Sequence, residues 1–406
     1  MSDYLSPMLT KDKSSSLNKN LNNLSLYNID KALETAFFYG FIPIKTPQAS
    51  KDDCLQSKSF ENGLCLQKIN QGLERSHSMN NKIYLLRTYI EGGFRSFPFP
   101  LSICYRDKEE YKKNDSESFL NLSILGSGSS VAEALALKTS LAILRDQEVK
   151  NLKIEINSVG DKESFGKFEK ELSNFVKKNA EVLPKDIIEI IKKEPNDILK
   201  KDLEDENKEM MANMPKPLNF LTPQAIKHFK EVLEYLEFFE TPYDLNHSLI
   251  PNKQYCSQTI FQIKADEAVV AVGVRHHNIV RKLHIRKEIP YLSVSIKDNI
   301  AKVKKTNIRK IKPKYFLVQF GNKAKAKCLA LIESLRKARI PIYHSLTKDK
   351  LMGQLTTAEN LNFPYILIIG EKEALEQSVV VRNTETRVQE TVSSCDLVNY
   401  LRKLKI

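Results

Sequence analysis

The chain has 406 residues, 41% of them hydrophobic, which is enough for two or three domains with apolar cores. Lys and Arg number 63 against 50 Asp and Glu, and the net charge of +13 favours a polyanionic partner, although a lysine-rich composition alone gives the same bias. No apolar run approaches the roughly 18 residues of a membrane span, no secretory signal opens the chain and no two of the six cysteines form a Cys-x-x-Cys pair, so we expect a cytoplasmic protein without a membrane segment or disulfide framework.

The first part of the chain predicts a tail, a helix and two extended segments. Residues 1–22 are rich in Ser, Asn and Lys without periodicity, and they predict a flexible tail. Apolar residues recur at helical spacing from Leu24 to Phe38, and Gly40 ends the predicted helix. Residues 41–47 and the apolar run at 82–87 are predicted to be extended.

A strand, a charged loop and a second strand are predicted at residues 98–125. Apolar and β-branched residues indicate strands at 98–106 and 118–125, with a solvated loop at 107–116 between them. Arg106 closes the first strand, where its guanidinium could hold a phosphate together with the loop. The alternative is a solvated charge at the end of a strand.

The middle of the chain predicts helices on either side of short strands. Apolar spacing indicates an amphipathic helix at 131–147 after a Gly and Ser turn, then a strand at 154–160. Residues 161–240 carry charged helical patterns and no strand pattern. His276 and His277 would point to opposite faces of a later strand, so we expect no metal site.

The last part of the chain predicts a basic linker and a small α/β module. Residues 297–314 carry eight basic residues and one acid, so this segment could follow an RNA backbone or could be a solvated hinge. Beyond it, strands at 315–320, 340–343 and 365–371 alternate with helices at 324–339 and 351–361, and a hairpin and a closing helix follow. This alternation predicts a small mixed or parallel sheet covered on both faces.

Several short motifs occur in one order along the chain. Tyr105 with Arg106, then Phe119 with Asn121, then a helix opening at 131–133 and the strand at 154–160 resemble histidyl-tRNA synthetase, a class II synthetase, over about residues 24–406. The final module resembles the anticodon-binding domain of the histidyl, glycyl, threonyl and prolyl synthetases over nearly all its length.

The resemblance implies an α+β fold with four parts. These are the flexible tail at 1–22, a class II synthetase-like antiparallel sheet core at 23–296 with a helical insertion at about 161–240, the basic linker at 297–314, and an α/β anticodon-binding domain at 315–406. It also implies a homodimer that binds tRNA or another structured RNA, and no DNA.

Several positions where this family holds its substrate carry other residues here. In the second class II motif Arg106 is kept, whereas Asn121 replaces the glutamine that binds histidine and Leu125 replaces the glutamate that holds the amino group. Pro251 stands at the place of the arginine that activates the carboxylate, and the third motif has no arginine. Because leucine offers no partner to an ammonium group in a desolvated pocket, we do not expect histidine to bind in the family's way.

Other positions keep the family's residue type or a related one. The resemblance implies that Arg106 and Arg275 are remnants of an ATP and substrate pocket, with Glu91, Asn121 and Tyr255 as further remnants of the substrate site. It assigns no catalytic residue.

The leading hypothesis is a synthetase paralogue without aminoacylation activity that binds RNA, or a protein partner, through the C-terminal module and the linker. The candidate RNA-binding residues are Lys304, Lys305, Arg309, Lys310, Arg336, Lys350, Gln354 and Arg382. The alternative is an active but divergent histidyl-tRNA synthetase, and only this alternative requires ATP and Mg. A third hypothesis is a histidine-sensing subunit like the synthetase-like partner of ATP phosphoribosyltransferase, but that partner lacks the anticodon module.

Overall fold

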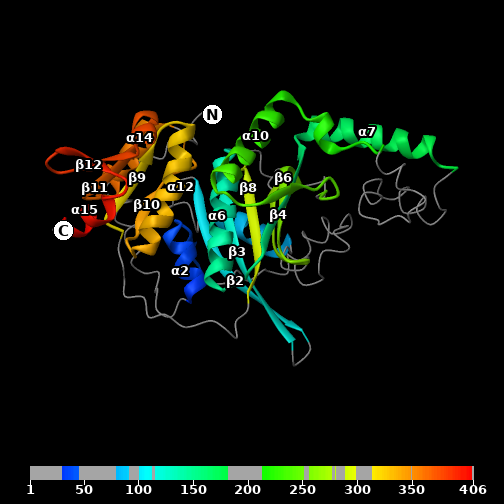
Figure 1. The fold of residues 1–406 in the computed structure, drawn as a ribbon. Helices are drawn as coiled ribbons and strands as arrows, with labels where there is room; N and C mark the ends of the chain where they lie inside the picture. Colours follow the sequence, from blue (N-terminus) through cyan, green and yellow to red (C-terminus); the bar gives the residue numbers. More distant parts are fainter. Residues whose placement is uncertain are drawn as a thin grey trace, which may run out of the picture.

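The computed structural model describes residues 30–44, 79–90, 100–111, 115–181, 213–250, 256–276, 279, 289–298, 313–348 and 350–404. Within these ranges the chain forms two β-sheets, each accompanied by helices (Figure 1). The first sheet is built from strands between residues 42 and 298, and the second from strands between 315 and 393.

The larger sheet has eight strands in the order β1-β2-β3-β8-β7-β6-β4-β5. Its strands are β1 (Ile42–Pro43), β2 (Leu101–Tyr111), β3 (Asp115–Leu125), β4 (Leu152–Gly160), β5 (Tyr243–Leu245), β6 (Cys256–Ala265), β7 (Ala268–His276) and β8 (Tyr291–Asp298). Neighbouring strands are antiparallel except at the two edges, where β1 runs parallel to β2 and β5 to β4. The predicted α+β fold with an antiparallel core is confirmed.

Side chains of this sheet alternate between two faces that different helices cover. One face is covered by α2 (Lys31–Phe38), α6 (Val131–Asp146) and α10 (Pro223–Phe238). Leu122 of β3 packs on that side, which we call the helical face. Leu125 of the same strand packs on the opposite side with Ile83 of α5 (Met79–Ile90), and we call this side the α5 face.

Local sequence signals explain where the helices of the core begin. Asp30 accepts hydrogen bonds from the backbone amides of Ala32 and Leu33 at the start of α2. Thr222 caps α10, whose first residue is a proline. Gly40, with φ +83°, follows the end of α2, as the sequence predicted.

Two predicted segments of the core were wrong. Residues 82–87 are not a strand but part of α5, because Ile83, Leu86 and Ile90 follow helical spacing. The predicted loop at 107–116 is mostly strand, because β2 and β3 pair as one long hairpin up to Tyr111 and Asp115. Charged residues can occupy the outer part of this hairpin because β2 and β3 extend there beyond the other strands of the sheet.

The helical segment between residues 161 and 240 packs against the far end of the sheet. α7 (Lys162–Lys178) begins at Asp161, whose carboxylate accepts from the Ser164 amide, and it contacts the short helix η3 (Pro217–Phe220). Their apolar side chains form a separate cluster with Val159. No strand occurs in the described part of this segment, as predicted.

The smaller sheet has five strands in the order β10-β9-β11-β12-β13. Its strands are β9 (Tyr315–Gln319), β10 (Ile342–His344), β11 (Tyr365–Ile369), β12 (Ser378–Asn383) and β13 (Gln389–Ser393), and its helices are α12 (Asn322–Lys337), α13 (Leu351–Asn360), α14 (Glu371–Glu376) and α15 (Leu397–Lys403). β9, β10 and β11 are parallel and β12 and β13 antiparallel, so the sheet is mixed, as predicted. The third strand ends before residue 371 because Glu371 begins α14.

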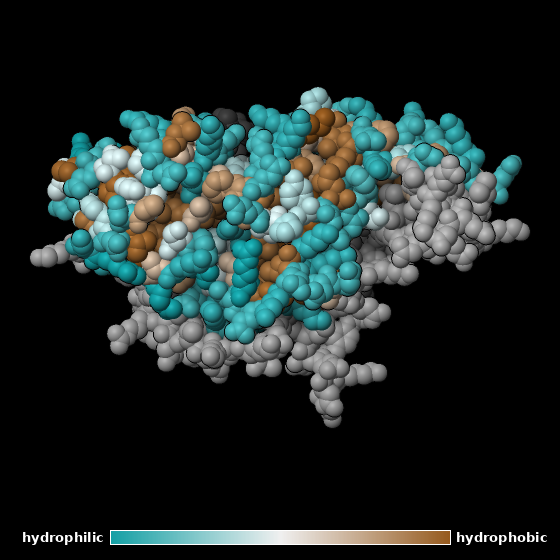
Figure 2. Space-filling model, viewed as in Figure 1, coloured by the Kyte–Doolittle hydropathy of each residue, from teal (hydrophilic) through white to brown (hydrophobic). Residues whose placement is uncertain are grey.

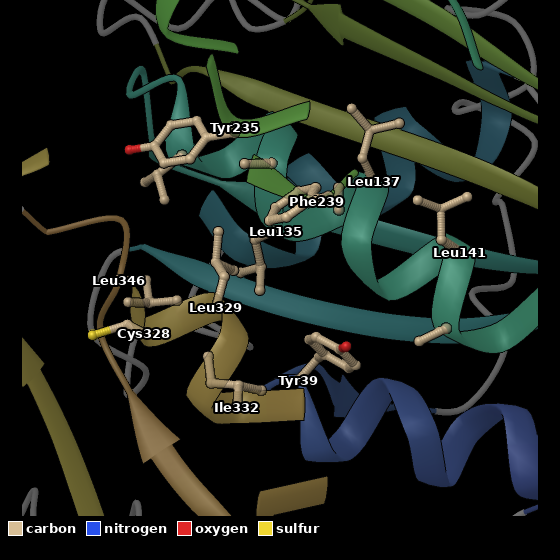
Figure 3. Close-up of a cluster of buried hydrophobic side chains, with 14 of the residues drawn as sticks. Tyr39, Leu135, Leu137, Leu141, Tyr235, Phe239, Cys328, Leu329, Ile332 and Leu346 are labelled. Atoms are coloured by element: carbon tan, nitrogen blue, oxygen red, sulfur yellow. The ribbon is translucent and has the colours of Figure 1, made fainter. Parts of the chain in front are cut away.

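One hydrophobic cluster joins the two sheets. Figure 3 shows Leu135 of α6 beside Leu329 and Ile332 of α12, with Tyr39 after α2 close by. The two units therefore share a buried apolar core at their junction.

The surface seen in Figure 2 is mainly hydrophilic, with hydrophobic residues interrupting it in several places. Within the described ranges, no helix is long and apolar enough to cross a membrane.

Candidate functional site

Asn121 lies near the middle of the α5 face. Its neighbours across the sheet are Tyr105 on β2 and Ser295 on β8. The Ser295 hydroxyl donates to Asn121 Oδ1 at 2.6 Å, and Asn121 Nδ2 is buried without a hydrogen-bond partner among the described residues. Asn121 is 4% exposed, so this amide belongs to the interior of the site.

Polar groups continue along the α5 face next to Asn121. The Ser123 and Tyr291 hydroxyls lie 3.1 Å apart. His276 Nε2 lies 2.8 Å from the Ser293 hydroxyl, and His276 Nδ1 lies 3.6 Å from the Cys256 thiol. Burial raises the pKa of both Tyr291 and Cys256, so these groups remain neutral.

Lys82 brings a buried amine to this face, and the sequence did not single it out. It lies on α5, is 4% exposed, and burial lowers its pKa to about 7. Because the sequence predicts a strand at residues 82–87, it gives no indication that a lysine faces the interior here.

Leu125 lies in apolar surroundings on the same face. It is fully buried, faces Leu101 and Tyr291 on the neighbouring strands, and belongs to one cluster with Ile83 and Leu86 of α5. The position at which the resemblance implies a glutamate therefore offers no polar group.

Arg106 lies on the opposite side of the sheet. Tyr105 faces Asn121, so the next residue points to the helical face, where Arg106 Nη2 lies 2.8 Å from Asp30 Oδ2. The same carboxylate caps α2. Arg106 thus connects a strand of the core to the start of a helix.

Arg275 is also bound on the helical face. Its Nε and Nη2 lie 2.6 and 2.5 Å from the two oxygens of Glu133, and it donates to the backbone carbonyls of Ser127 and Ser129. His228 Nε2 lies 3.0 Å from Glu133 as well. Both members of the Arg275 ion pair are less than 5% exposed.

The electrostatics of Glu133 show how strongly this pair is held. Burial alone would raise the pKa of Glu133, but the Arg275 guanidinium and the His228 hydrogen bond outweigh burial and bring the pKa to about 2. Glu133 is therefore ionised at every pH near neutrality, and Arg275 is its buried counter-ion.

These positions separate the residues that were predicted to be remnants of one ATP and substrate pocket. Arg106 and Arg275 both point away from Asn121, because strand residues of opposite parity face opposite sides of the sheet. They do not converge with Asn121 on one ligand. Glu91 and Tyr255 lie outside the described residues, as do Lys304, Lys305, Arg309 and Lys310 of the linker.

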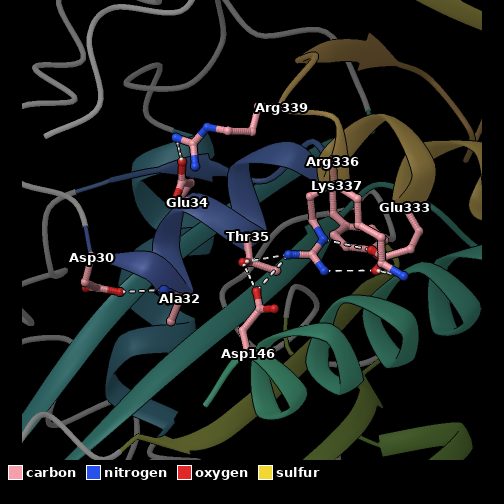
Figure 4. A network of polar contacts seen from close by, with 10 residues as sticks. Asp30, Ala32, Glu34, Thr35, Asp146, Glu333, Arg336, Lys337 and Arg339 are labelled. Atoms are coloured by element: carbon pink, nitrogen blue, oxygen red, sulfur yellow. Dashed lines mark hydrogen bonds and ion pairs between the residues drawn. The ribbon is translucent and has the colours of Figure 1, made fainter. Parts of the chain in front are cut away.

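Arg336, predicted to contact RNA, is bound at the junction of the two units. Its guanidinium forms ion pairs with Glu333 and with Asp146 of α6, each at 2.8 Å, as Figure 4 shows. The Tyr39 hydroxyl donates to Glu333 at 2.6 Å. These groups connect α12 to the core, so Arg336 has a structural role at the junction, and its contact with RNA stays a prediction.

Gln354, also predicted to contact RNA, is fully buried. Its amide donates to the carbonyl of Gln319 and accepts from the amide of the same residue, so it joins α13 to the end of β9. A buried side chain with these bonds is structural. Sequence similarity could not distinguish this role from RNA contact.

Lys350 and Arg382 remain accessible. Lys350 is exposed immediately before α13. Arg382 lies opposite Gln389 in the β12–β13 hairpin, is partly exposed and forms no ion pair with a described residue. Arg387, in the turn of the same hairpin, is exposed and was missed by the sequence analysis, which had no signal for it.

The described residues contain no group of three or more His, Cys, Asp or Glu side chains that could hold a metal ion.

Comparisons with known proteins cover both units. A family model described as "Anticodon binding domain" matches residues 314–404. A protein named "Histidine--tRNA ligase" from Aquifex aeolicus is 25% identical over 79% of this chain and 78% of its own length, and one from Rickettsia bellii is 23% identical over 93% and 94%.

One solved structure, of apo S. aureus histidyl-tRNA synthetase, covers 99% of both chains at 18% identity with a TM-score of 0.49. By sequence, the chain is similar to histidine--tRNA ligases along most of its length, and residues 314–404 match the anticodon-binding domain.

Proposed function

We propose that this protein binds a tRNA or another structured RNA through its anticodon-binding-like module and does not activate histidine. The observation that carries the proposal is the position of Arg275, which is buried on the helical face with both guanidinium edges bound inside the protein. As the resemblance implies, we further expect a homodimer in the cytoplasm.

Activation of an amino acid needs positive groups around the triphosphate and a negative group at the substrate ammonium. On the α5 face Lys82 is buried near Cys256, α5 also carries Arg87, whose Nη2 is buried, and Leu125 stands in place of the carboxylate. Moving Arg275 to a ligand would leave Glu133 charged and buried, at a cost of several kcal/mol. These arrangements favour a core without synthetase chemistry.

The β12–β13 hairpin is the best candidate for RNA contact. Arg382 and Arg387 both lie on it without a carboxylate partner among the described residues. By contrast, Arg336 in α12 and Arg339 just after α12 form ion pairs with the core. α13 packs on β9 and does not cover β13, which is exposed along almost its whole length. Unpaired guanidinium groups on an open strand surface suit phosphate oxygens.

Binding of a tRNA transcript across a salt series tests this proposal. Wild-type protein should bind with an affinity that falls steeply as salt rises, because phosphate contacts release counter-ions. The double variant Arg382→Gln, Arg387→Gln should weaken binding about tenfold at low salt and reduce the slope of log K against log salt by about 2.

The matched control is Lys170→Gln, Lys177→Gln, which removes two exposed charges from α7, away from the C-terminal module. It should leave affinity and slope close to wild type. If the wild-type protein shows no salt-dependent binding to tRNA, the proposed function is wrong. If the hairpin variant binds like the control, RNA uses another surface.

A further inference from the structure

Basic side chains from both units meet on the surface where α6, α10 and α12 pack together. Lys138 and Arg145 lie on α6, seven residues apart, so they share one side of that helix at a spacing of roughly 10 Å. Lys327 and Lys337 lie on α12, which belongs to the other unit. We call these four residues the junction patch.

Two aromatic rings at the end of α10 connect the cations of the junction patch. Lys138 Nζ lies 4.5 Å from the centre of the Phe239 ring, and Lys327 Nζ lies 5.7 Å from the centre of the Phe238 ring. The two rings are neighbours, with centres 6.3 Å apart. The patch is therefore continuous from the core to the C-terminal module.

The acids around the junction patch are largely occupied by other partners. Glu333 holds Arg336 and Tyr39, and Asp146 holds Arg336 and accepts from Thr35 (Figure 4). Lys337 reaches Glu333 only at 3.6 Å and its side chain is 72% exposed.

The cations of the patch are weakly neutralised. Arg145 is exposed and forms no ion pair with any described residue. Burial lowers the pKa of Lys138, and the nearby charges of Arg145 and Lys337 lower it further, against the opposing effect of Glu333 and Glu240. A bound anion would reduce the repulsion between these positive side chains.

We propose that the junction patch is a second RNA contact, at which the phosphodiester backbone of a structured RNA crosses from the C-terminal module to the core. This inference rests on the proposed function. The two units are held in a fixed relation by a shared apolar cluster and by the Arg336 ion pairs, so a rigid RNA can meet both basic surfaces at once.

The test uses full-length protein with the substitutions Arg145→Gln and Lys337→Gln. Both side chains are exposed and neither contributes to the apolar core, so the variant should fold. Its affinity for a tRNA transcript should fall about five- to tenfold, and the slope of log K against log salt should fall by about 2. Its affinity for a short single-stranded oligoribonucleotide, which is too small to span both units, should not change.

The control Lys170→Gln, Lys177→Gln separates the loss of this patch from the loss of net charge. Equal tRNA affinities of the junction variant and this control would overturn the inference, and so would an equal loss for tRNA and oligonucleotide. Wild-type protein that binds no tRNA would refute the proposed function itself. If the junction variant loses affinity while Arg382→Gln, Arg387→Gln does not, the inference stands and the hairpin is not the module's RNA surface.

Discussion

Replacing Arg275 by Met should lower the free energy of unfolding by about 3–5 kcal/mol, because the change leaves the Glu133 carboxylate buried without its counter-ion. The carbonyls of Ser127 and Ser129 lose their donors at the same time. Urea denaturation at pH 7 measures this loss. Replacing Lys167, whose ion pair with Glu163 lies on the surface of α7, should cost about 0.5 kcal/mol or less.

The pH dependence gives this prediction a second readout. In the wild type the pKa of Glu133 is about 2, below the ordinary 4.5, so its contribution to stability is complete above pH 4.5 and is lost as the pH falls toward 2. In the Met variant Glu133 keeps only the His228 contact, so burial should raise its pKa above the ordinary value and the variant should lose stability as the pH rises above about 4.5.

The difference between wild type and Arg275→Met should therefore be larger at pH 7 than at pH 4. An equal difference at both pH values, or a loss below 1 kcal/mol, would mean that the ion pair does not hold the helical face together. The double variant Glu133→Gln, Arg275→Met should lose less than the sum of the two single variants, because the two residues interact directly.

Replacing Leu125 by Glu should destabilise the protein by about 4 kcal/mol at neutral pH and should not restore histidine activation. The new carboxyl would lie in the apolar cluster with Ile83, Leu86 and Tyr291, where desolvation disfavours its charged form. Because burial raises the pKa of such a group, the loss should be larger at pH 8 than at pH 5. Urea denaturation at the two pH values measures it.

The control for this substitution is Leu125→Met, which keeps the volume and the apolar character and should cost less than about 1.5 kcal/mol. A Leu125→Glu variant as stable as the Met variant would indicate that the α5 face is open to solvent or ligand at this position. Such a result, together with histidine binding in calorimetry, would favour the active-enzyme alternative.

Periodicity in the sequence predicted most of the fold because most elements are long and amphipathic. The helix at 131–147 and the strands of the C-terminal module follow from apolar spacing alone, and the structure has them within a few residues. α5 was missed because the apolar run from Ile83 to Leu86 is compatible with a buried strand. Burial of Lys82 on the same helix could not be read from that run.

The site was harder to predict than the fold because a match to a motif does not determine on which face of the sheet a side chain lies. Tyr105 and Arg106 match a family motif, and Arg106 was assigned to the pocket because the motif has an arginine at this position. In a strand, a difference of one residue moves the side chain to the other face, and the pairing of Tyr105 with Asn121 places Arg106 on the helical face.

The junction could not be predicted because its contacts join segments far apart in the sequence. Tyr39 and Glu333 are 294 residues apart, and Asp146 and Arg336 are 190 apart. No local pattern indicates such contacts. Arg336 was therefore predicted to bind RNA by its likeness to the family, while the structure shows it joining α12 to α6.

Whether this core activates histidine can be measured as histidine-dependent exchange of pyrophosphate into ATP, with Mg and full-length wild-type protein. Because Arg275 is bound to Glu133 on the helical face and Leu125 offers no group for the substrate ammonium, we expect exchange at the background seen without histidine. Exchange well above that background, dependent on histidine and saturating with it, would show that the protein is an active synthetase.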